Sequence, residues 1–78
     1  MPQQKQRVVQ AVIFKKRWYT PDKARSWLSR HNYIPIKRVH ITSHYLRYRI
    51  KEPYLFESFF MINANDAGTI KLVIGYMK

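Results

Sequence analysis

The chain contains no cysteine, and none of its apolar stretches approaches the roughly 20 residues needed to span a bilayer as a helix. The absence of cysteine excludes disulfides and thiolate chemistry, and it fits a reducing compartment. The opening residues, MPQQKQR, are also too polar for a secretory signal. We therefore expect a soluble intracellular protein that makes no use of a membrane.

Acidic residues are scarce, and the four that are present are scattered along the chain: Asp22, Glu52, Glu57 and Asp66. General acid–base catalysis and magnesium binding both need carboxylates in close association, and no segment supplies them. His40 and His44 have a spacing that suits zinc on a helix, but they fall on a predicted strand and turn without a further ligand nearby. The sequence thus predicts a non-enzymatic protein that uses neither a cofactor nor a metal.

Positive charge is abundant, since 15 Lys and Arg residues give a formal net charge of +11. Such a density repels itself unless a partner neutralises it, and nucleic acid, DNA or RNA, is the commonest such partner. An acidic protein surface is the other candidate. A hydrophobic content of 46% argues against disorder, and 78 residues suffice for one domain. Residues 1–6 are polar and without pattern, so we expect a flexible arm there.

A helix is predicted over TPDKARSWLSRHN, residues 20–32. Thr20 is a suitable N-cap, Pro21 fits the first helical position, and Asp22 complements the helix dipole. Four residues then follow at helical spacing and form one face, which we expect to pack on a sheet: Ala24, Trp27, Leu28 and His31. Asn32 is a plausible left-handed cap at the other end.

The first predicted strand, RVVQAVIFKKR, is apolar on both faces and should therefore be central in a sheet. Strict alternation places Val8, Val12 and Phe14 on one side and Val9, Ala11 and Ile13 on the other. After the helix, IPIKRVHIT predicts a weaker strand, which Pro35 assigns to an edge. YLRYRIK alternates cleanly and predicts a half-buried strand, and IKLVIGYMK predicts the last one.

The stretch from Pro53 to Asn65 is ambiguous, because it begins like a short helix and continues as an apolar run. Two α+β folds follow from this ambiguity. With a second helix the order suits a compact ferredoxin-like arrangement, the split β-α-β unit; without it we expect a four-stranded antiparallel sheet covered by one main helix. The run FFMI is too apolar to be left wholly in water, so a surplus could form a homodimer contact.

The strand from Tyr45 to Lys51 carries the best candidate site, because alternation gathers basic and aromatic side chains on one face: Tyr45, Arg47, Arg49 and Lys51. Arginine and lysine can neutralise phosphates while tyrosine offers a stacking surface. Further basic residues could extend this face: Lys15, Lys16, Arg17, Lys37 and Arg38. We expect a nucleic-acid-binding protein of low sequence specificity, with docking on an acidic protein partner as the alternative.

From Ala11 onward the chain resembles a small α/β domain of tailed-phage structural and head-morphogenesis proteins and of large DNA viruses. The resemblance depends on Thr20 at the helix start, Trp27-Leu28 with His31 inside it, Arg47-Tyr48-Arg49 before Pro53, and the closing strand from Ile70 to Tyr76. It implies a viral source, a small α/β fold and a location in a host cell or virion. It carries over no active-site residue, and it makes a structural or adaptor role in a virion the alternative function.

Overall fold

The computed structural model describes residues 6–78. Along the chain lie β1 (Arg7–Lys15), α1 (Pro21–Arg30), β2 (His40–Ile41), β3 (Tyr45–Arg49), a 3₁₀ turn (Pro53–Leu55), β4 (Phe56–Asn63) and β5 (Ile70–Met77). The flexible arm predicted for residues 1–6 lies outside the described residues except for Gln6. The carbonyl of Gln6 accepts a hydrogen bond of 2.9 Å from the Met77 amide.

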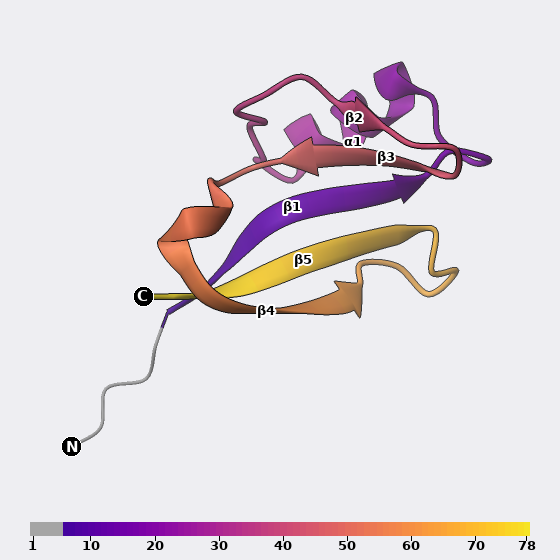
Figure 1. Cartoon of the computed structure of the whole chain (residues 1–78). Coiled ribbons are helices and arrows are strands. Elements are labelled where there is room, and N and C mark those ends of the chain that lie inside the picture. The colour runs from indigo at the N-terminus through magenta and orange to yellow at the C-terminus, as the bar shows by residue number, and fades with distance from the viewer. Residues whose placement is uncertain (1–5) are drawn as a thin grey trace.

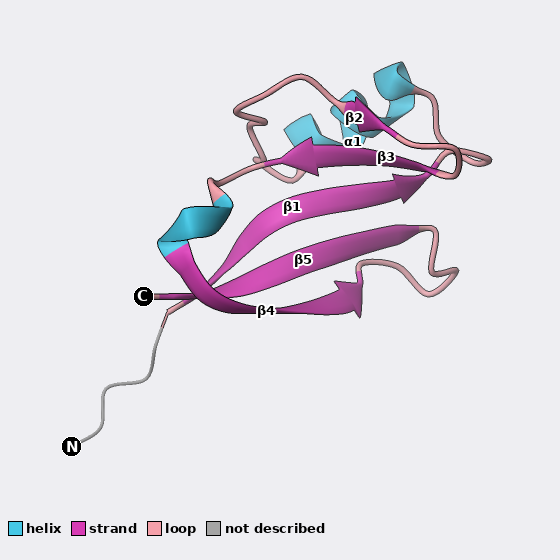
Figure 2. Cartoon of the chain, in the orientation of Figure 1, coloured by secondary structure: helices cyan, strands magenta, loops and turns pink. Residues whose placement is uncertain are grey.

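The strands form one five-stranded sheet in the order β2-β3-β1-β5-β4. Every neighbouring pair is antiparallel, and β1 lies in the centre between β3 and β5. Helix α1 packs behind the half of the sheet that contains β2 and β3, as Figures 1 and 2 show. The protein is therefore an α+β fold in which one helix covers one face of an antiparallel sheet.

The ambiguous stretch forms a strand rather than a second helix, so the sheet has five strands instead of four. Pro53 begins only a single 3₁₀ turn, and from Phe56 onward the chain pairs with β5. The turn between the two strands is stabilised by Asn65, whose Oδ1 accepts hydrogen bonds from the amides of Thr69 and Ile70 at 3.1 and 3.3 Å. Of the two predicted folds, the sheet covered by one helix is the one observed.

Helix α1 begins and ends as its sequence predicts. The Thr20 hydroxyl accepts a 3.3 Å hydrogen bond from the Lys23 amide, and Asn32 ends the helical segment with a left-handed φ of 61°. Ala24 and Leu28 are buried, whereas Trp27 is half-buried at the rim of the core. The Trp27 ring stacks on His31 at a centroid distance of 3.9 Å and meets the edge of Phe14 at 5.6 Å.

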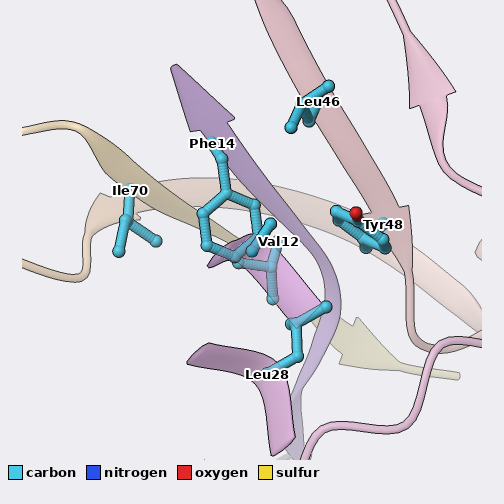
Figure 3. Close-up of a cluster of buried hydrophobic side chains, with 7 residues drawn as sticks. Val12, Phe14, Leu28, Leu46, Tyr48 and Ile70 are labelled. Carbon is cyan, nitrogen blue, oxygen red and sulfur yellow. The ribbon is translucent and has the colours of Figure 1, made fainter. Parts of the chain in front are cut away.

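The core lies between α1 and the sheet. Figure 3 shows Leu28 of the helix directed toward Val12, with Phe14 beside it. These side chains are fully or almost fully buried, and β3 and β5 complete the cluster with Leu46, Tyr48 and Ile70. The alternation predicted for β3 is thus observed, because Leu46 and Tyr48 face the helix while Tyr45 and Arg47 are exposed.

The two faces of β1 differ from the prediction because the strand has a bulge at Gln10. Val9 pairs with Ile74 and Ala11 with Val73, so β1 has one more residue than β5 at this point. Val9, rather than Val8, therefore joins Val12 and Phe14 on the helix side of the sheet. The carbonyl of Gln10 accepts hydrogen bonds from the amides of Ile50 and Lys51, at 2.8 and 3.1 Å.

The prediction of a strand over IPIKRVHIT is wrong for most of that segment. Only His40 and Ile41 pair with β3, although the predicted position at an edge is confirmed. Residues 34–39 form an irregular segment in which the Ile36 amide donates a 2.9 Å hydrogen bond to the Arg49 carbonyl. Pro35 has no amide proton to add to a ladder, so regular pairing does not extend through it.

Candidate nucleic-acid interface

No α-helix described within residues 6–78 covers the face of the sheet opposite α1, although at one end of this face Phe56 packs over Gly75 and is buried with Ala11 and Val73. In Figure 1 the helix lies behind the strands, so this open face is turned toward the viewer. The strand register determines what it presents: Ile13 of β1 lies between Arg47 of β3 and Lys71 of β5, and Lys15 lies beside Tyr45. The open face therefore combines cations with apolar and aromatic side chains.

A basic hollow of about 360 Å³ lies where the open face meets the β2 edge. All of its lining residues have basic side chains: Lys37, Arg38, His40, Arg47 and Arg49. His40 lies opposite Arg47 in the β2–β3 ladder, and the irregular segment before β2 supplies the other two. The structure thus brings together four of the predicted site residues in one concave surface.

Glu52 partly neutralises this basic hollow. One of its carboxylate oxygens lies 3.6 Å from the Lys37 ammonium, and the other lies 3.6 Å from the Arg49 guanidinium. Arg47 instead donates a weak hydrogen bond of 3.4 Å to the side-chain oxygen of Gln10. Since an amide leaves the positive charge of the guanidinium uncompensated, Arg47 is better placed than Arg49 to attract an anion.

A second hollow, of about 240 Å³, adjoins the first on the open face. It is more apolar, and it is lined by residues from β1, the β2–β3 turn, β3, β4 and β5: Ile13, Thr42, Tyr45, Arg47, Met61 and Lys71. Arg47 lines both hollows. Tyr45 is 37% exposed, so one edge of this apolar hollow offers an accessible aromatic residue.

The remaining predicted residues lie around these hollows rather than within them. Lys15 is half-buried beside Tyr45, whereas Lys16 and Arg17 are exposed in the turn after β1. The Arg17 guanidinium lies 5.4 Å from the centre of the Trp18 ring. Lys51 is exposed beyond the far end of β3, where its carbonyl accepts a 3.0 Å hydrogen bond from the Gln10 side chain. Of the predicted basic residues, those that share the basic hollow are Lys37, Arg38, Arg47 and Arg49.

Sequence reasoning missed several residues of the two hollows. The sequence suggests His40 only as a metal ligand and Met61 only as part of a homodimer contact, and it assigns Lys71 to no site. The alternation of the last strand does place Lys71 opposite Ile70 and Leu72, and this signal could have identified it as a surface residue. Its position beside Ile13 depends on the strand register, which the sequence does not specify.

Other features of the described residues bear on chemistry. Within residues 6–78, no group of three or more His, Asp or Glu side chains is arranged to hold a metal ion. In the same range, no helix is long and apolar enough to cross a membrane.

Burial raises the pKa of Tyr48, while Arg25 lowers it and Asp22 raises it to smaller extents. Tyr48 faces the helix, and its hydroxyl donates a 3.3 Å hydrogen bond to the Pro21 carbonyl, so this shift belongs to the core.

Comparison with protein-family models, with curated proteins and with solved structures gave no significant match. The resemblance to viral structural domains therefore stays a prediction.

Proposed function

We propose that this protein binds nucleic acid through the open face of its sheet, by phosphate neutralisation combined with aromatic stacking. The observation that carries the proposal is the adjacency of the two hollows on that face, with Arg47 lining both. Phosphates would occupy the basic hollow, because guanidinium groups donate strong hydrogen bonds to phosphate oxygens. An unstacked base would lie against Tyr45 in the apolar hollow.

This arrangement favours binding of single-stranded nucleic acid with low sequence specificity. A base can enter the apolar hollow only when it is not paired within a duplex, and every base has a π face that can stack on tyrosine. The lining offers few groups for reading base edges, namely the Thr42 hydroxyl and the cations Arg47 and Lys71. Affinity would therefore depend chiefly on charge and stacking, and the preference between DNA and RNA would be small.

The alternative is a structural or adaptor role in a virion, in which the same basic hollow docks on an acidic protein surface. Both functions use positive charge, but only nucleic acid releases condensed counterions when phosphates are neutralised. The dependence of the affinity on salt concentration therefore separates the two.

The test is a salt titration of binding to single-stranded and duplex DNA and RNA, for the parent and for Arg38→Gln/Arg47→Gln. We expect the affinity of this variant to fall for every sequence alike, and the salt slope to shrink by about 1 to 2 units. Lys23→Gln/Arg30→Gln is the matched control, because it removes the same charge from exposed positions on α1. Equal losses in both variants would contradict the assignment to the open face. A parent that binds none of the four ligands would leave the virion-adaptor role as the better proposal.

A further inference from the structure

The two edges of the sheet differ in how they are protected. The edge formed by β2 is only two residues long and follows the basic residues Lys37 and Arg38. The edge formed by β4 is eight residues long, and its sequence, FESFFMIN, contains no proline, lysine or arginine. Short edges and edge lysines prevent unwanted strand pairing, whereas a long apolar edge invites it. By these criteria β2 is protected and β4 is open to pairing.

Strand β4 also exposes apolar side chains on both of its faces. Met61 and Phe59 lie on the open face and are 53% and 46% exposed. Ile62 is 44% exposed on the other face, where it lies opposite Leu72. No strand described within residues 6–78 pairs with the outer edge of β4, so the outward amides and carbonyls from Phe59 to Asn63 have no strand partner there.

We propose that β4 pairs antiparallel with β4 of a second copy of this chain. A second copy suits this edge because its exposed apolar residues, Phe59, Met61 and Ile62, would pack against the same residues across the seam, and because repulsion between the copies is least here. The chain has a net charge of +11, so two copies repel each other wherever their basic surfaces meet. Strand β4 carries a single charged residue, Glu57, and the basic hollow lies at the opposite edge of the sheet. Pairing through β4 therefore keeps the basic surfaces of the two copies far apart.

The symmetry of such a dimer follows from strand geometry. Two identical antiparallel strands in one sheet are related by a two-fold axis perpendicular to that sheet, so both open faces lie on the same side. The two sheets of five strands join into one continuous sheet. Met61 and Phe59 of both copies then lie together on the open side of the seam, while the two Ile62 side chains lie on the other side. This proposal does not depend on the proposed function, although a dimer would present two basic hollows on one surface.

The first test is sedimentation equilibrium of the nucleic-acid-free protein over a range of concentrations at high salt. We expect the parent to be dimeric and Met61→Lys to be monomeric, because the substitution places a cation of each copy at the seam. Ile34→Lys is the matched control: Ile34 is 80% exposed in the irregular segment before β2, so it adds the same charge away from β4. We expect this control to stay dimeric. A parent that is monomeric throughout the range overturns the proposal.

The second test uses the absence of native cysteine to map the seam. Single cysteines are introduced in turn at the five positions from Phe59 to Asn63, which cover both faces of β4, and at Ile34 as a control. A two-fold seam brings a residue opposite its own counterpart only near the axis. We therefore expect the yield of disulfide-linked dimer under mild oxidation to peak at one β4 position and to be negligible at Ile34. Equal yields at all six positions, or no linked dimer at any of them, would overturn β4 self-pairing.

Discussion

The ring of Phe56 lies directly over the backbone of Gly75, so closely that a Cβ atom at Gly75 would overlap it. Both residues are buried, and they lie on adjacent strands, β4 and β5, near the end of their ladder. The backbone of Gly75 does not have a positive φ, so the glycine is needed here for space rather than for conformation. The close approach anchors the start of β4 against the sheet.

We expect Gly75→Ala to destabilise the fold by about 1 to 3 kcal/mol, because Phe56 must move out of a packed position. Denaturant unfolding of the parent and the variant measures the difference. The control is a double-mutant cycle with Phe56→Leu, in which the smaller side chain should make Gly75→Ala less costly. The same cost in both backgrounds would show that Phe56 is not the obstacle.

Replacing Tyr45 tests the stacking surface of the apolar hollow. We expect Tyr45→Ala to weaken single-stranded ligands by about 1 to 3 kcal/mol, the range for loss of one stacked base, and to weaken duplex less. Fluorescence anisotropy at one fixed salt concentration measures both. Tyr45→Phe is the control, because it keeps the ring and should bind single strands nearly as well as the parent does. Equal weakening of single strands and duplex by Tyr45→Ala would argue against a stacked base.

Removing the Glu52 carboxylate should increase nucleic-acid binding. In Glu52→Gln, Lys37 and Arg49 lose the acid that lies 3.6 Å from each, so we expect a higher affinity and a salt slope steeper by about 1 to 2 units. Asp22→Asn is the matched control. It raises the net charge by the same amount and removes the acid that pairs with Arg25, but it does so on α1, away from the basic hollow. If total charge alone governs binding, the two variants will gain equally, and this outcome would count against the basic hollow.

Because Tyr48 is buried, we expect its ionisation to limit the stability of the fold at alkaline pH. Burial raises its pKa above the ordinary value of about 10, so the unfolded chain releases the phenolic proton at a lower pH than the folded chain does. The stability that the protonated Tyr48 hydroxyl contributes is fully present below its pKa in the unfolded chain. It is lost as the pH rises through its pKa in the folded chain. We expect the free energy of unfolding to fall more steeply for the parent than for Tyr48→Phe above about pH 10.

At neutral pH the same variant should lose about 0.5 to 1.5 kcal/mol, because the hydrogen bond to the Pro21 carbonyl is missing. Urea unfolding at a series of pH values measures both effects, and the two proteins differ in no other titratable group. Parallel stability curves across the alkaline range would show that Tyr48 does not set the limit.

Local sequence signals predicted the helix, the central position of β1 and the exposed basic face of β3. These features depend on capping, on composition and on alternation within one segment, all of which can be read without knowing the neighbours. The residues of β4 were ambiguous because an edge strand that is apolar on both faces shows no alternation. The position of Val9 was missed because a bulge at Gln10 reverses the faces of the strand, and no residue type marks it.

The candidate site was predicted in part for a similar reason. Arg47 and Arg49 follow from alternation within β3, but the meeting of Lys37 and Arg38 with them depends on the path of residues 34–39 across the sheet edge. The ion pairs of Glu52 depend equally on the chain direction after β3. Such contacts join segments that are distant in sequence, so only the folded structure reveals them.

The central position of β1 has a consequence for the order of folding. The β4–β5 hairpin and the β2–β3 pair each join strands that are close in sequence, and they can form early at low entropic cost. Strand β1 pairs instead with β3 and β5, so that Arg7 lies opposite Tyr76. During synthesis on the ribosome, the apolar residues of β1 emerge well before those of β5 and stay without this partner strand until β5 follows. A ribosome that stalls before β5 would therefore leave one side of this strand unpaired, and such a chain would depend on chaperones to stay soluble.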